Sequence, residues 1–275
     1  PMQVFAGPDA AGLTMRATVD VPATVGRLTA PLLPGVRHRW DDVGGVEVRV
    51  EGRDPESRSL SAVFAGGNAL AVETAEGWEI VQFRNASLIG DAVWRLTGLL
   101  RGQQGTEAAT RAGAPAGAIV VFLDEALART PSSPAERGLP LIWRAGPAGA
   151  PPGGAGTAEV TFTHLGLHGR PWSPAHLRTV ERADGGIDLT WLPRSRLDGD
   201  RWDGVTEPSD PPRYRVRVLS GDEEVRAFEV EGEAATYAAG DIVVDFPEGL
   251  EDAEVAVAQW GEAWGWGVEA RRSLA

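Results

Sequence analysis

The chain has 275 residues, of which 43% are hydrophobic and 10 are tryptophan, so it has enough apolar material for more than one core. It contains no cysteine, which excludes disulfides, thiol catalysis and thiolate metal sites. The formal net charge is −13, which disfavours a nucleic-acid partner, and every basic residue is arginine.

The charge is unevenly distributed along the chain. Residues 1–171 hold 17 acidic and 15 basic side chains, a net charge of −2, whereas residues 172–275 hold 22 acidic and 11 basic side chains, a net charge of −11. The second part would therefore repel a phosphate backbone, and we expect no nucleic-acid binding there.

Short apolar or alternating runs recur along the first 165 residues, between Gly, Pro and Asp residues. Strict alternation in Val46–Val50 is typical of a half-buried strand. Helical turns are expected only at Thr106–Arg111 and Asp124–Ala128, so the sequence predicts an all-β protein whose first domain is a β-barrel or a β-sandwich. The predicted strands are Gln3–Ala6, Leu13–Val21, Val46–Val50, Leu60–Phe64, Trp78–Phe83, Val93–Leu100, Ile119–Leu123 and Ala158–His164.

Two segments have the composition of connections. Residues 145–156 are rich in Ala, Gly and Pro, which indicates a loop. The two prolines of residues 168–174, HGRPWSP, indicate an extended link between domains. We therefore predict a first domain over residues 1–171 and a second over 172–275.

The second domain is predicted to contain seven short strands, the number found in immunoglobulin-like sandwiches. With IDLTW followed by RYRVRV, the pattern resembles a fibronectin type III domain, in which Trp191 would occupy the buried aromatic position. Leu250–Val257 lacks the tyrosine expected at the corner between the fifth and sixth strands, so that corner must be held differently. The predicted strands are Ala175–Val180, Gly186–Leu192, Arg213–Leu219, Glu224–Val230, Ala235–Ala238, Ala253–Trp260 and Gly267–Ser273.

The most informative motif is LTGLLRGQQGTE, residues 96–107. Gly102 and Gly105 follow an apolar strand and are suited to backbone conformations with positive φ in a tight turn. We expect Arg101, Gly102, Gly105, Thr106 and Glu107 to form a structural motif. Taken alone, the motif is equally compatible with an ordinary Gly-rich turn.

The form LLRGQxGTE, preceded by WEIVQFRNASLIGDAVWRL, resembles the C-terminal region of phage tail-tip proteins related to the host-specificity protein. The same region occurs in the baseplate proteins of gene transfer agents, called megatron proteins. The segment SRLDGDRWDG, residues 195–204, resembles the long loop between the second and third strands of that family's last domain.

This resemblance implies a non-catalytic virion structural protein of the tail tip, made in the bacterial cytoplasm. It implies a homotrimeric hub that contacts other tail or baseplate proteins and the recipient-cell surface, with no cofactor. A carbohydrate-binding β-module of a surface or secreted protein is the alternative, and a polysaccharide-degrading accessory piece ranks third.

Tryptophans are concentrated in WGEAWGWG, residues 260–267. In a type III sandwich Trp260, Trp264 and Trp266 would lie at the end that also carries Trp202, and we expect Trp202, Trp264 and Trp266 to converge there. The favoured interpretation is a buried plug, and the alternatives are a protein interface or a sugar-stacking platform.

Other chemistry has little support in the sequence. None of the four histidines has HExxH spacing, acidic neighbours such as Asp124 and Glu125 would point to opposite faces of a strand, and G-x-S-x-G is absent. The acidic loop Asp198–Asp203 departs from calcium-loop spacing, so no metal is expected. The sequence shows neither a signal-peptide pattern nor a stretch long enough to span a membrane. Because its first residue is Pro rather than Met, we interpret the chain as a piece of a longer protein.

Overall fold

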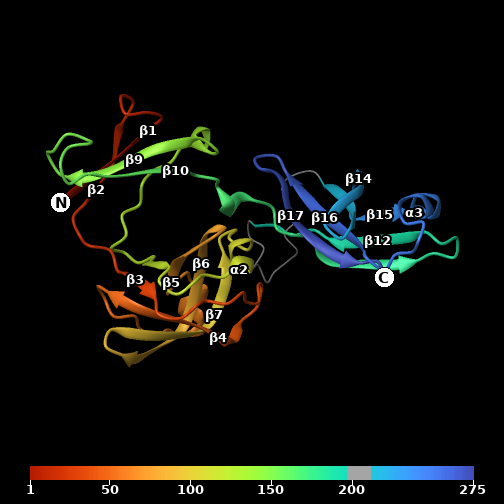
Figure 1. Ribbon diagram of the computed structural model, residues 1–275, viewed down its shortest axis with the longest axis horizontal. Helices are drawn as coiled ribbons and strands as arrows, with labels where there is room; N and C mark the ends of the chain where they lie inside the picture. Colours follow the sequence, from red (N-terminus) through yellow and green to blue (C-terminus); the bar gives the residue numbers. More distant parts are fainter. Residues whose placement is uncertain (197–211) are drawn as a thin grey trace. The chain divides into compact units, whose positions relative to one another are not determined.

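The computed structural model describes residues 1–196 and 212–275. The protein is all-β, as predicted, and it divides into two compact units, Pro1–Leu167 and His168–Ala275 (Figure 1). The sequence had placed the division four residues later, after residue 171.

A closed six-stranded antiparallel barrel forms the centre of the first unit, with strand order β3-β4-β7-β6-β5-β8. In Val46–Val50 the three valines are buried and the residues between them face outward, so the predicted alternation is confirmed. The core also contains Leu70, Val81 and Phe83. The strands are β3 (Val25–Leu28), β4 (Asp41–Glu51), β5 (Ala69–Thr74), β6 (Gly77–Gly90), β7 (Val93–Gln103) and β8 (Ile119–Phe122).

The prediction of a strand at Leu60–Phe64 was wrong, because these residues form the short helix α1. The hydroxyl of Ser59 caps its first turn by accepting a hydrogen bond from the Ala62 amide at 3.3 Å. Of the predicted helical turns, Thr106–Arg111 overlaps helix α2 (Ala109–Ala112), whereas Asp124–Ala128 is a non-helical turn.

The first unit also contains a separate four-stranded sheet of order β10-β9-β1-β2. In the chain, the barrel strands lie between β2 and β9 of this sheet. Strand β1 (Met2–Gly7) pairs both with β2 (Thr14–Val19), its neighbour in the sequence, and with β9 (Pro140–Pro147), which follows the barrel. Strand β10 (Ala158–Thr163) completes the sheet. The predicted loop at 145–156 begins only after Pro147, because β9 continues that far. Two single-turn 3-10 helices occur nearby, η1 (Pro134–Glu136) and η2 (Leu167–Gly169).

The second unit is a fibronectin type III-like sandwich of two sheets, with orders β11-β12-β15 and β14-β13-β16-β17. All seven predicted strands are present. Trp191 is buried and its ring meets that of Tyr214 edge-on, with 5.2 Å between centroids. The strands are β11 (Ala175–Glu181), β12 (Ile187–Leu192), β13 (Arg213–Ser220), β14 (Glu223–Glu231), β15 (Ala234–Tyr237), β16 (Ala253–Gly261) and β17 (Gly265–Ser273).

A hydrogen-bonded triad occupies the corner that lacks the expected tyrosine. Between β15 and β16 the chain forms helix α3 (Ala239–Asp245), which the sequence did not predict. The buried Tyr237 hydroxyl donates to Asp245 Oδ2 at 2.7 Å, and Arg226 Nε donates to the same oxygen at 2.5 Å. Hydrogen bonding to Arg226 lowers the pKa of Asp245. Through its hydrogen bond to Asp245, Tyr237 of the preceding strand β15 holds the corner in place of the tyrosine missing from Leu250–Val257.

Candidate functional site

The arginine of LLRGQQGTE is buried in a two-pronged ion pair. Arg101 Nε and Nη2 donate to the two carboxylate oxygens of Glu79 at 2.6 and 2.8 Å, and Nη1 donates to the Leu33 carbonyl at 3.1 Å. The Arg101 and Glu79 side chains are 1% and 0% exposed, so water does not stabilise either charge and each is compensated mainly by the other.

Two further donors complete the surroundings of the Glu79 carboxylate. The Gly102 amide donates to Oε1 at 3.1 Å and the Thr110 hydroxyl donates to it at 3.0 Å. Strand β6, the end of strand β7 and helix α2 are thus joined through one carboxylate. Sequence reasoning missed Glu79. Glu79, Val81 and Phe83 occupy every second position of the strand and share its buried face, and this spacing could have identified Glu79 as a buried carboxylate.

The rest of the motif shapes the turn. Gly102 and Gly105 have φ values of +61° and +87°, as predicted. A Cβ on Gly102 would lie 2.7 Å from the Thr110 hydroxyl and 3.0 Å from the Glu107 Cα. The Thr106 hydroxyl accepts from the Ile80 amide at 2.9 Å, and both Thr106 and Glu107 are buried.

A second group of charges borders this network. The backbone of Arg37 forms an isolated parallel β-bridge with that of Arg101. Burial lowers the pKa of Arg37, and Arg111 lowers it further, whereas Glu107 raises it. The guanidinium groups of Arg37, Arg101 and Arg111 thus lie near the motif, with Glu79 as the partner of Arg101 and Glu107 as a counter-charge to Arg37.

Two of the predicted tryptophans form an edge-to-face pair beside an arginine in the second unit. Trp260 of β16 and Trp266 of β17 are paired across the strands, with ring centroids 4.9 Å apart. The Arg213 guanidinium lies 4.8 Å from the Trp260 ring centre and 5.4 Å from that of Trp266, and it pairs with Glu229. Both rings are half-buried.

The convergence predicted for Trp202, Trp264 and Trp266 stays a prediction, because Trp202 is not among the residues that the structure describes. Val255 and Val257 of β16 point into the core of the sandwich. Trp260 lies on the opposite face of the strand, with Ala256 and Ala258, so its ring covers the outer face of the sheet. Trp264 is half-buried in the turn that joins β16 to β17. Trp202 lies outside the described residues, and so does the acidic loop Asp198–Asp203.

The segment predicted as an extended link packs against the sandwich instead. The Val268 amide donates to the Pro171 carbonyl at 3.0 Å. Trp172 lies under two guanidinium groups, those of Arg194 at 4.3 Å and Arg196 at 5.0 Å. Sequence reasoning missed Trp172, since its arginine partners come from the segment that follows strand β12, more than 20 residues later in the chain.

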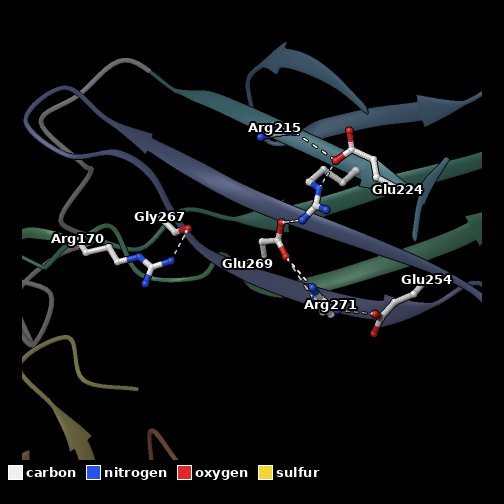
Figure 2. A network of polar contacts seen from close by, with 8 residues as sticks. Arg170, Arg215, Glu224, Glu254, Gly267, Glu269 and Arg271 are labelled. Carbon is white, nitrogen blue, oxygen red and sulfur yellow. Dashed lines mark hydrogen bonds and ion pairs between the residues drawn. The ribbon is translucent and has the colours of Figure 1, made fainter. Parts of the chain in front are cut away.

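A ladder of alternating charges covers the outer face of the sandwich's four-stranded sheet, β14-β13-β16-β17 (Figure 2). Glu224 pairs with Arg215 and Arg217, Arg217 Nη1 donates to Glu269 at 2.6 Å, and Glu269 in turn pairs with Arg271. Burial alone would raise the pKa of Glu269, but the Arg217 and Arg271 guanidiniums outweigh it and the pKa lies below its ordinary range. The ladder continues from Arg271 to Glu254.

A cavity of about 800 Å³ opens at one end of the barrel. It is formed where β3 and β5 begin and where β4 and β8 end, so the antiparallel order brings these four strand ends together. Phe83 and Phe122 line its inner part, and their rings meet edge-on at 6.3 Å. Its charged lining residues are Arg53, Asp54, Glu56, Arg58, Asp124, Glu125 and Arg129.

Within residues 1–196 and 212–275, no cluster of three or more His, Cys, Asp or Glu side chains is arranged to hold a metal ion. In the same part of the chain, no helix has the length and hydrophobicity needed to cross a membrane.

The family-model comparison concerns the first unit alone. Residues 23–121 match the family model described as Rcc01698-like, C-terminal, and this segment coincides with the barrel from β3 to β8. The match covers less than half of the chain. The comparison with curated proteins found no match.

Solved structures with some likeness include a segment of two fibronectin type III domains from chicken tenascin. It is 9% identical, with 91% of this chain and 98% of that chain covered and a TM-score of 0.26. The rat CD45 extracellular region is 16% identical, with 43% of this chain and 54% of that chain covered and a TM-score of 0.25. This chain thus spans about half of the CD45 segment, and at such TM-scores the likeness carries no argument about function.

Proposed function

We propose that this chain is a non-catalytic structural component of the tip or baseplate of a phage-like tail, of the kind carried by gene transfer agents. There it would help to build the hub, act within a homotrimer, and contact other tail proteins or the recipient cell. Its place would be the tail tip of a virion-like particle.

One observation carries this proposal: the barrel that matches the Rcc01698-like family model is also the element that contains LLRGQQGTE. The charged side chains of that motif are engaged within the barrel, where Arg101 and Glu79 satisfy each other. This use of the motif supports a role in maintaining the fold, in keeping with a structural protein.

Labelling of intact particles tests the proposal. Antibody fragments raised against the chain should decorate one end of the tail in negative-stain electron micrographs, and cryo-EM of that end should show three copies. Purified particles that lack the chain by mass spectrometry, or labelling confined to the head, would refute it. A preparation from a strain that lacks the gene is the control for antibody specificity.

A carbohydrate-binding β-module is the second candidate, favoured by the half-exposed rings of Trp260 and Trp266. Aromatic faces of this kind can stack on sugar rings, although Arg213 already lies over both of them. If this function is correct, removal of Trp266 should abolish glycan binding by the isolated chain while its attachment to tail particles is unaffected.

A further inference from the structure

We propose that the cavity at the end of the barrel is a binding site for a neutral oligosaccharide. This proposal goes beyond the tail-tip function and does not depend on it, since the cavity belongs to the barrel whatever particle carries it. It also differs from the second candidate function, which places sugar binding on the sandwich.

The size and position of the cavity fit a ligand of a few sugar rings. Ligand sites in proteins commonly have volumes of about 300–1,000 Å³ and occur in the mouths of β-barrels. The cavity, at about 800 Å³, lies within that range, and its walls come from four strand ends and the segment around α1. Oligosaccharides are among the ligands that small β-barrels bind.

The lining alternates hydrogen-bond donors and acceptors. Arg53 Nη1 donates to Glu125 Oε1 at 2.8 Å, and Glu56 lies within 4.0 Å of Arg53 and 3.6 Å of Arg58. Each of these four side chains is at least 49% exposed, so it retains groups that can face a ligand. A sugar hydroxyl both donates and accepts, and neighbouring hydroxyls match the paired donors of a guanidinium and the paired acceptors of a carboxylate.

Two lining residues have no partner among the residues that the structure describes. The guanidinium of Arg129 and the carboxylate of Asp54 take part in no ion pair or hydrogen bond with any of them, and both residues are exposed. They therefore supply a donor and an acceptor that a ligand can engage without first breaking an existing contact.

The charge of the lining argues for a neutral ligand. Three arginines face four carboxylates, and Arg53 and Arg58 are already paired with Glu56 or Glu125. An anionic ligand would have to displace these carboxylates and would meet net negative charge, whereas a neutral polyol can hydrogen-bond with both kinds of group. The apolar side chains of Leu123 and Leu127 offer contact for the C–H faces of the sugar rings.

Titration calorimetry with four tetrasaccharides tests the proposal on the full 275-residue chain. The probes are chitotetraose, cellotetraose and mannotetraose, which are neutral, and tetragalacturonate, which is acidic. Two variants alter the cavity: Ala65→Trp, at an exposed lining residue with an ordinary φ of −76°, adds an indole to its wall, and Arg129→Ser removes the unpaired donor.

Matched controls place the same changes elsewhere. Ala148→Trp adds an indole at an exposed alanine in the loop after β9, and Arg178→Ser removes an exposed arginine from β11. Trp266→Ala tests the sandwich as the competing site.

The expected result is saturable binding of at least one neutral tetrasaccharide. Binding should weaken about tenfold or more in Arg129→Ser, since a hydrogen bond from a charged group is lost, and should also weaken in Ala65→Trp, since the indole takes up part of the cavity. The three other variants should bind as the wild type does.

The proposal is overturned if no neutral probe binds at millimolar concentration, if only tetragalacturonate binds, or if Trp266→Ala abolishes binding while Arg129→Ser does not. Should Ala65→Trp fail to fold, Arg129→Ser decides the question alone, because its side chain supports no described contact. None of these outcomes depends on where the chain lies in a particle, so the tail-tip proposal stands or falls separately.

Discussion

The barrel and the sandwich use charged residues in opposite ways. In the barrel, Arg101 and Glu79 are buried away from water, and each charge is compensated mainly by the other. In the sandwich, the arginines and glutamates form a ladder on the outer face of a sheet, where water reaches them. The same residue types should therefore matter greatly for stability in one unit and little in the other.

The largest effect is expected from Glu79→Ala, which leaves Arg101 charged and unpaired in the barrel. Removing one partner of a buried ion pair costs about 3–5 kcal/mol of unfolding free energy. Hydrogen exchange followed by mass spectrometry should show loss of protection in β6, β7 and α2, with the sandwich peptides unchanged.

The double variant Glu79→Leu/Arg101→Met is the control, because it replaces both charges with apolar groups of similar size. It should recover part of the lost protection, because no buried charge remains but the Gly102 amide and the Thr110 hydroxyl lose their acceptor. Full protection of the barrel in Glu79→Ala would contradict the assignment of this pair as the central contact of the motif.

The next largest effect is expected at Gly102, which tests the backbone beside that ion pair. Gly102→Val should destabilise the barrel by about 1–3 kcal/mol, because φ is +61° and the new side chain meets the Glu107 backbone. Chemical denaturation measures the change. Gly117→Ala separates the two causes, since Gly117 also has positive φ, at +87°, but no atom lies within 4 Å of its added Cβ.

Alkaline pH should act on the sandwich alone. The chain has two tyrosines, Tyr214 and Tyr237, and both are buried in the second unit. Burial raises the pKa of Tyr214 to about 12, and burial together with the neighbouring Asp245 raises the pKa of Tyr237. Since the folded pKa values exceed the unfolded value of about 10, stability is complete below pH 10 and falls as the pH rises, by about 1.4 kcal/mol per pH unit for each tyrosine.

The absence of lysine makes this measurement clean, because no lysine titrates in the same range. Hydrogen exchange at pH 8 and pH 11, corrected for the intrinsic rate, should show weakened sandwich peptides and unchanged barrel peptides. In Tyr237→Phe the pH dependence should become shallower. Equal loss in the barrel would contradict the comparison between the units.

The sequence predicted the elements well where the signal is local. Alternation in Val46–Val50 identified the buried face of β4, and all seven strands of the sandwich were located from short apolar runs. The positive φ at Gly102 and Gly105 followed from their place after an apolar strand.

The failures concern contacts between residues far apart in the chain. Strand β1 pairs with β9 across the whole inserted barrel, and Glu79 lies 22 residues before Arg101, so no local pattern connects them. Leu60–Phe64 was misassigned because a single cap at Ser59 outweighs the strand-like composition of five residues. The predicted domain division remains a prediction, and so does the role of the tryptophans, since Trp202 lies outside the described residues.

The smallest effect is expected on the ladder. Glu269→Gln removes a carboxylate that pairs with Arg217 and Arg271, yet partly exposed pairs of this kind contribute at most about 1 kcal/mol. Because the folded pKa of Glu269 is lowered, its contribution is present above the ordinary value of about 4.3 and is lost as the pH falls through the folded pKa. Urea denaturation at pH 7 and pH 3 should show a small difference between wild type and variant at pH 7 only, and high salt should shrink it. A loss of several kcal/mol at pH 7 would mean that the outer face is as sensitive as the barrel interior, and the contrast between the two units would then be wrong.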